Sequence, residues 1–198
     1  MNKNPNTPEF FNKLFNGTFD LCGVSRPYIY EAESRKAAYK ELIKMPFFNF
    51  SGKILDVGCG MGGVLSLISK DEPIEKFGID FSAVGIKKCI QRMDGCFCIG
   101  DIHNLPYEDN FFDRVICIQT LEHIDNVEQV VSEIWRVLKV NGMALITVPY
   151  KPHGRDTLRL HINRFSTKNL SKLFELKYSI KSIYVINNAI RLIVSKNK

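Results

Sequence analysis

The stretch ILDVGCGMGG, residues 54–63, decides how this chain folds. It begins as a short apolar strand interrupted by Asp56, and four glycines follow within six positions. Glycine adopts backbone conformations that a side chain forbids, so the chain can turn sharply and a ligand can approach the backbone closely. We therefore predict a strand over residues 53–57, a tight turn, and a helix over residues 63–69 whose N–H groups face a ligand crevice.

Strand and helix patterns alternate after this stretch. Strands are expected where short apolar runs occur, and helices where apolar residues recur at helical spacing. In chain order these are the strands 76–79, 96–99, 113–119 and 143–148 and the helices 83–92, 127–138 and 167–175. Such alternation implies parallel strands with helices on both faces of the sheet.

The chain ends differently. Two β-rich runs, residues 178–186 and 189–195, are separated by Asn187-Asn188. Asparagine tolerates the left-handed backbone that a tight hairpin turn requires, so an antiparallel hairpin is expected at or near a sheet edge. The predicted fold class is therefore α/β: a Rossmann-like, doubly wound, mostly parallel seven-stranded sheet with a C-terminal antiparallel hairpin.

The 198 residues fit one domain, with residues 50–198 as the Rossmann-like core. Residues 1–48 form an N-terminal helical segment, in which a short amphipathic helix around residues 10–15 and a helix over residues 31–45 are expected. The many aromatic residues of this segment fit two roles: a lid over a ligand, or padding at the edge of the sheet.

Composition excludes several protein classes. Hydrophobic residues make up 45% of the chain and charged residues 24%, ordinary values for a globular protein, so disorder, collagen and coiled coil are excluded. No apolar run is long enough to span a membrane, and residues 1–15 lack a signal-peptide pattern, which predicts a cytoplasmic protein. The six cysteines are expected in or near the core, and neither they nor the four histidines show metal-ligand spacing, so no metal is expected.

Charge is distributed unevenly along the chain. The formal net charge is +6, but residues 1–150 hold 16 basic and 19 acidic side chains, whereas residues 151–198 hold 11 basic and 2 acidic ones. This asymmetry fits either a solvated face that keeps the protein soluble or an anionic partner near the C-terminal end.

The glycine spacing by itself leaves the ligand open. Gly58-x-Gly60-x-x-Gly63, with Asp80 about 20 residues on, also fits the dinucleotide fingerprint of NAD(P)-dependent oxidoreductases. Asp56 argues against that alternative, because a carboxylate beside the loop would repel a pyrophosphate and attract an ammonium group. Asp101 then adds a third carboxylate at the end of a third strand, at the sheet edge where open α/β folds bind ligands.

Five blocks, in order, carry a resemblance to a known family: ILDVGCGMGG (54–63), GIDFS (78–82), GDIHNLPYEDNFFD (100–113), LEHIDN (121–126) and EIWRVLKVNGMALITVP (133–149). With HINRFSTKNLSKLF (161–174), they resemble class I S-adenosylmethionine-dependent methyltransferases, in particular the small-molecule subgroup of ubiquinone and menaquinone biosynthesis. The resemblance covers about residues 50–176.

The resemblance implies a cofactor, S-adenosyl-L-methionine, and roles for the matching residues. Asp80 would accept from the ribose hydroxyls, Phe81 would pack on the adenine, and Asp101 and the Ile102 amide would bind the adenine edge. Asp56 would lie near the methionine ammonium, with Gln119 under the methionine part. The full expected set is Asp56, Gly58, Cys59, Gly60, Gly62, Asp80, Phe81, Asp101, Ile102 and Gln119.

The sequence says less about the binding of the methyl acceptor than about the binding of the cofactor. Methyl transfer by in-line displacement needs positioning and water exclusion more than a protein nucleophile. Candidates for a general base or a pocket hydrogen bond are His123, His153, His161 and Tyr150. Arg155, Arg159 and Arg164 could bind an anionic small-molecule acceptor. A nucleic-acid substrate stays as an alternative because of the basic end, although Gln119-Thr120-Leu121-Glu122 is not the Asn/Asp-Pro-Pro-Tyr/Phe block of amino-methylating nucleic-acid enzymes. No oligomeric state is predicted.

Overall fold

The computed structural model describes residues 6–16, 33–150 and 161–197. Its helices are α1 (Pro8–Phe15), α2 (Glu33–Ile43), α3 (Ala83–Arg92), α4 (Val127–Val137) and α5 (Thr167–Phe174), with short 3₁₀ turns η2 (Pro46–Phe48), η3 (Leu65–Leu67) and η4 (Leu121–His123). Its strands are β1 (Gly52–Val57), β2 (Ile74–Asp80), β3 (Cys96–Ile99), β4 (Phe112–Ile118), β5 (Leu138–Pro149), β6 (Tyr178–Ile186) and β7 (Ala189–Lys196).

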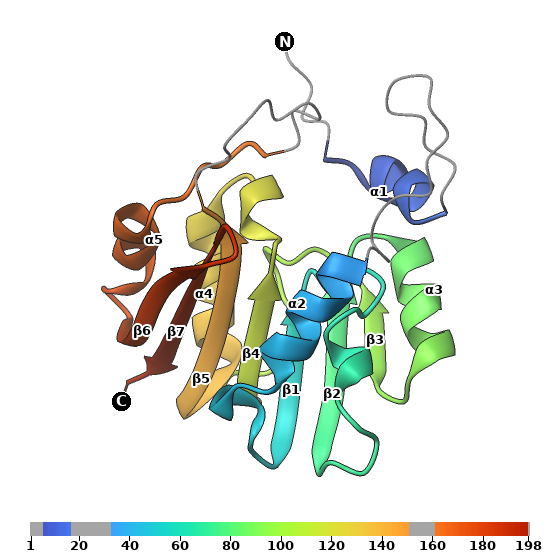
Figure 1. Cartoon of the computed structure of the whole chain (residues 1–198), viewed down its shortest axis with the longest axis horizontal. Helices are drawn as coiled ribbons and strands as arrows, with labels where there is room; N and C mark the ends of the chain where they lie inside the picture. Colours follow the sequence, from blue (N-terminus) through green and yellow to red (C-terminus); the bar gives the residue numbers. More distant parts are fainter. Residues whose placement is uncertain (1–5, 17–32, 151–160, 198) are drawn as a thin grey trace.

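All seven strands form one sheet in the order β3-β2-β1-β4-β5-β7-β6 (Figure 1). β1 to β5 are parallel to one another, whereas β7 runs antiparallel between β5 and β6. The predicted fold class, a doubly wound and mostly parallel seven-stranded sheet with an antiparallel hairpin, is confirmed. Because β1, β2 and β3 are neighbours, the acidic residues near their carboxyl ends share one edge of the sheet.

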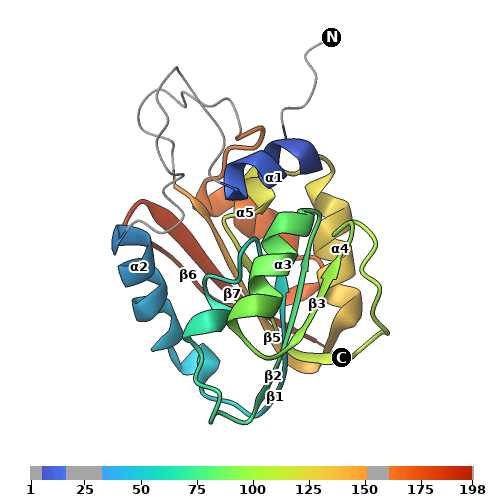
Figure 2. The same ribbon diagram turned by 90° about the vertical axis from the view of Figure 1, so that its right-hand side faces the viewer.

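The sheet separates two apolar cores. On β4, Val115 and Cys117 contribute to one core, and Ile116 and Ile118 contribute to the other, as the two-residue period of a strand requires. α4 and α5 cover the first face, and α2 lies across the second (Figure 2). Of the residues predicted for the inner face of the helix over 127–138, Val130, Val131, Ile134 and Val137 are buried in α4. Leu138 is also buried, but it is the first residue of β5 and not part of the helix.

The helix predicted over residues 63–69 is wrong. Turns and the short η3 occupy this segment, and the N–H groups of Leu67 and Ile68 reach back only three residues, to Val64 and Leu65. Short runs of this kind commonly take the tighter 3₁₀ form, and isolated short helices are marginally stable.

Helix α1 confirms the amphipathic helix expected near the N-terminus. Pro8 occupies its first turn, and the Thr7 side chain caps it by accepting from the N–H of Phe10. The Asn12 side chain accepts from the Ser82 hydroxyl (2.7 Å) and from the N–H of Val84 (3.2 Å). These bonds hold α1 at the start of α3, beyond the carboxyl ends of the parallel strands (Figure 1).

Cysteine placement matches the expectation in part. Cys59, Cys89 and Cys117 are buried, but Cys96 is exposed because β3 is a short edge strand with little packed against it. Cys22 lies outside the described residues. Among the helices of the described ranges, none has the length and apolar character to cross a membrane.

The turn between β6 and β7 explains the hairpin. Asn187 and Asn188 both have a left-handed backbone, with φ of 49° and 58°. A two-residue turn with both φ values positive matches the right-handed twist of the flanking strands. The Asn-Asn pair therefore sets the register that pairs Ile186 with Ala189.

We predict that Asn188→Ala destabilises the protein by about 1 kcal/mol, because a Cβ without a compensating polar group disfavours the left-handed backbone. Asn188→Gly is the matched control and should stay within about 0.5 kcal/mol of the unsubstituted protein. Urea unfolding followed by circular dichroism measures both. Equal stability of the Ala and Gly variants would show that the turn conformation costs nothing.

Candidate functional site

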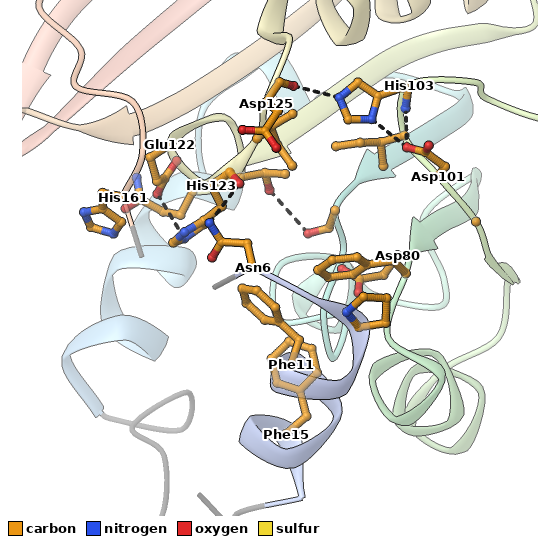
Figure 3. A pocket seen from close by; sticks show the side chains of 18 of the residues that line it. Asn6, Phe11, Phe15, Asp80, Asp101, His103, Glu122, His123, Asp125 and His161 are labelled. Atoms are coloured by element: carbon orange, nitrogen blue, oxygen red, sulfur yellow. Dashed lines mark hydrogen bonds and ion pairs between the residues drawn. The ribbon is translucent and has the colours of Figure 1, made fainter. Parts of the chain in front are cut away.

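A cavity of about 530 Å³ lies at the carboxyl ends of the parallel strands. This volume falls within the range of small-molecule and cofactor sites. Its walls come from the segments that follow β1 to β4, together with α1 and one residue each from α2 and the segment after β5 (Figure 3). The predicted residues among them are Gly58, Asp80, Phe81, Asp101, Ile102, Gln119, His123 and His161.

The glycine loop is tied to the end of β2. The N–H groups of Gly58 and Cys59 both donate to the carbonyl of Ile79, at 2.9 and 3.1 Å, and the N–H of Gly60 donates to Asp80 Oδ2 at 2.8 Å. Gly58 has a φ of +75°, and a Cβ there would collide with the Thr120 side chain. Glycine is required at this position for both reasons, so the loop backbone can form one wall of the cavity.

Asp80 is buried, and its carboxylate can still accept further hydrogen bonds. Its Oδ2 accepts from Gly60 and its Oδ1 accepts from the N–H of Ser82 at 2.8 Å. Burial raises the pKa of Asp80 above its usual value, and these two backbone bonds oppose that effect. Each carboxylate oxygen has two lone pairs, so Asp80 can accept two further hydrogen bonds from the cavity.

Asp56 lies beneath the loop and is 3% exposed, outside the residues that form the cavity walls. Within the described residues its Oδ1 has no hydrogen-bond partner. Burial, followed by the negative charge of Asp80, raises the pKa of Asp56 to about 8. A nearby cationic group would favour the ionised form of this carboxyl.

Asp101 is held by a histidine that the sequence patterns did not single out. Its Oδ1 accepts from the N–H of His103 (2.9 Å) and lies 2.7 Å from His103 Nδ1, while His103 Nε2 lies 2.8 Å from the Asp125 carbonyl (Figure 3). The bond from the His103 N–H lowers the pKa of Asp101. Burial alone would lower the pKa of His103, but the Asp125 carbonyl and Asp101 outweigh it and raise that pKa. Asp101 therefore stays ionised at the cavity rim.

Three side chains gather on the other side of the cavity: Glu122, His123 and His161 (Figure 3). Glu122 Oε1 lies 3.9 Å from His123 Nε2, and the rings of His123 and His161 are 5.0 Å apart. Burial raises the pKa of Glu122 to about 8, although its own backbone N–H and Arg35 oppose the change. The structure thus brings two of the predicted histidines together with a carboxyl that the sequence patterns did not single out.

The structure separates the other predicted acceptor-side residues from this cavity or does not describe them. Tyr150 packs partly against the core and forms a bridge with Phe165, away from the cavity walls. Arg164 is exposed and lines a different depression beside Asn126. His153, Arg155 and Arg159 lie outside the described residues.

Aromatic side chains of α1 cover the cavity. Phe11 and Phe15 line it, and the Phe11 ring lies 5.2 Å from that of Phe81 and 5.9 Å from that of His123. Apolar cover of this kind keeps water away from a bound ligand. Arg35 of α2 also lines the cavity, and no motif in its surroundings pointed to it.

Comparison with known proteins agrees with the geometry. Residues 55–146 match the model of a methyltransferase domain. The chain is 36% identical over 104 residues to norajmaline N-methyltransferase of Rauvolfia serpentina, covering 49% of this chain and 35% of that protein. It is 34% identical over 105 residues to demethylmenaquinone methyltransferase of Thermotoga maritima, covering 52% and 46%. The chain therefore spans less than half the length of these curated relatives.

The fold is also found in solved structures. The PH0226 protein of Pyrococcus horikoshii OT3 superposes with a TM-score of 0.71 at 24% identity, over 85% of this chain and 93% of that one. At this identity the likeness concerns the fold alone. Residues 55–146 are therefore similar in sequence to methyltransferase domains, and the sheet has a fold found among solved structures.

Proposed function

We propose that this protein transfers the methyl group of S-adenosyl-L-methionine to a small-molecule acceptor by in-line displacement. The observation that carries the proposal is the cavity wall along the carboxyl edge of the sheet, where Asp101, Asp80, Gly58 and Gln119 follow one another in the order of the strands. Those positions are the ones to which the resemblance assigns the cofactor.

The nucleoside part of the cofactor fits the wall formed after β2 and β3. The free acceptor sites of Asp80 suit the two ribose hydroxyls, which are both donors. Ionised Asp101 suits the adenine amino group, and the Ile102 N–H can donate to a ring nitrogen. Phe81 and Phe11 supply apolar surface on which the adenine can pack.

The methionine part fits the glycine loop. Gly58 lines the cavity there, whereas Cys59, Gly60 and Gly62, which the resemblance also assigns to the cofactor, are not among the wall residues. Asp56, whose pKa is about 8 in the ligand-free fold, gains the complementary negative charge when a bound ammonium group favours its ionised form. Gln119 holds a left-handed backbone with a φ of 53° and directs its side-chain amide toward Thr147 (3.4 Å). A non-glycine residue in this conformation is strained, and such residues cluster at functional sites.

When bound, S-adenosyl-L-methionine supplies an electrophilic methyl carbon on a sulfonium. The protein's own contribution is to orient the acceptor and keep water out, with α1 as the cover. His123 and His161 are the candidate groups to accept an acceptor proton, since both line the cavity. By their names, the relatives above methylate two different acceptors, norajmaline and demethylmenaquinone.

Physical arguments weigh against two alternative functions. A nicotinamide dinucleotide would bring its pyrophosphate beside Asp56 and Asp80, two buried carboxyls, and the negative charge of Asp80 already raises the pKa of Asp56. A nucleic-acid substrate would need a basic surface at the mouth of the cavity. Among the described residues of the cavity walls, Arg35 is the one basic Lys or Arg side chain. An anionic acceptor bound by Arg155 and Arg159 stays a prediction.

Isothermal titration calorimetry tests the cofactor. S-Adenosylmethionine and S-adenosylhomocysteine should bind, and Asp80→Ala should weaken both by at least tenfold because the ribose hydroxyls lose their acceptor. Asp71→Ala is the matched control, since Asp71 is exposed in the loop before β2. This variant should bind both ligands as tightly as the unsubstituted protein. Binding of NADH in place of both ligands would contradict the proposal.

The pKa of Asp56 predicts a pH dependence of stability. The unfolded chain loses this proton near pH 3.8 and the folded chain near pH 8, so stability falls as pH rises between these values. Asp56→Asn removes this loss. From pH 5 to pH 8 the unfolding free energy of the variant, relative to the unsubstituted protein, should rise by roughly 3–4 kcal/mol.

Urea unfolding of the ligand-free protein at several pH values measures this difference. The comparison uses the change with pH, so any fixed cost of placing an amide in the buried position cancels. Curves that run parallel from pH 5 to pH 8 would show that Asp56 is already ionised in the ligand-free fold.

A further inference from the structure

The cluster at the acceptor side of the cavity has the composition of a metal site. Glu122, His123 and His161 each offer one ligand atom, and these atoms all lie within 4.8 Å of one another. Two imidazoles and one carboxylate form a common ligand set for divalent zinc and for other first-row metals. All three residues line the cavity (Figure 3).

Glu122 gives an independent reason to expect a cation. The residue is 1% exposed, and within the described residues its Oε2 has no hydrogen-bond partner. An orphaned carboxyl oxygen in a buried position is costly, and such groups are commonly paired or bound to metal. The Glu122 carboxyl also lines the cavity that a small cation can enter.

The backbone that carries the three residues is tied together. Asn163, two residues after His161, donates from Nδ2 to the carbonyls of Leu121 (2.9 Å) and Ile124 (2.6 Å), and from its N–H to the carbonyl of Glu122 (3.1 Å). η4 and the segment after β5 therefore form a fixed frame. In a tetrahedral zinc site neighbouring ligand atoms lie about 3.3 Å apart, so side-chain rotations of modest size close the cluster around an ion.

We propose that Glu122, His123 and His161 bind a divalent first-row transition metal such as Zn²⁺. Three protein ligands leave coordination positions open, and these face the cavity, where an oxygen or nitrogen atom of the acceptor can occupy one. The expectation of no metal followed from sequence spacing, which could not reveal a ligand set split between adjacent residues 122–123 and residue 161. Metal ligation would replace the proton-accepting role of His123 and His161, and the part of the proposal that concerns the acceptor rests on the proposed methyl transfer. Metal binding itself is tested without the cofactor.

Arg35 is the competing partner of Glu122. It lines the same cavity, and its positive charge favours ionised Glu122. If Glu122 serves only to pair with Arg35, the cluster has no need of a metal. If the metal site is correct, Arg35→Gln keeps metal affinity or raises it, because one positive charge near the ion is removed.

The test is calorimetric titration of the full chain, freed of metal with a chelator, with Zn²⁺ in the absence of S-adenosylmethionine. One equivalent should bind, and Glu122→Gln and His161→Ala should each lose at least tenfold in affinity. His103→Ala is the matched control, since His103 lines the same cavity outside the cluster, and it should bind like the unsubstituted protein. Circular dichroism confirms that each variant is folded.

Cobalt substitution gives a second readout that does not depend on variants. Co²⁺ should show the d–d absorption of a nitrogen and oxygen ligand set without a thiolate charge-transfer band, which excludes the cysteines as ligands. The proposal is overturned if no equivalent binds, if the spectrum shows thiolate ligation, or if folded Glu122→Gln and His161→Ala bind as tightly as the control.

Discussion

The N–H groups of Gly58 and Cys59 share the carbonyl of Ile79, and the N–H of Gly60 donates to the Asp80 carboxylate. These bonds hold the glycine loop against the end of β2. They orient Asp80 toward the cavity, and they require the positive φ that only glycine adopts easily at position 58. The cavity walls depend on this contact, because a loop displaced from β2 would neither leave room for a ligand nor fix the carboxylate.

Sheet order then determines what meets at the cavity. Because β3, β2, β1 and β4 are neighbours, Asp101, Asp80, Gly58 and Gln119 approach from consecutive strand ends. α1 closes the cavity from above through its bonds to Ser82 and Val84. One face of this arrangement is suited to a nucleoside, and the side with Glu122, His123 and His161 is left for an acceptor.

The sequence predicted the elements that depend on neighbouring residues, but it did not predict the contacts between segments that lie far apart in the chain. The spacing of apolar residues predicted the strands of the sheet, and Asn187-Asn188 predicted the hairpin, because both features depend on residues close in sequence. His103, Glu122 and Arg35 were not predicted, since each matters only through contact with a residue brought close by the fold. Tyr150 and Arg164 were expected at the site because the resemblance places the segment after the fifth strand beside the acceptor pocket, but the course of the chain after β5 carries them elsewhere.

The central claim is that the carboxyl edge of the sheet holds S-adenosylmethionine. A crystal structure of the protein grown with S-adenosylhomocysteine tests it most directly. The account predicts ribose hydroxyls within hydrogen-bond distance of Asp80, adenine beside Asp101 and Ile102, and the amino group on the side of Asp56. Ligand bound at another surface, or a cavity that stays empty at saturating concentration, would contradict it.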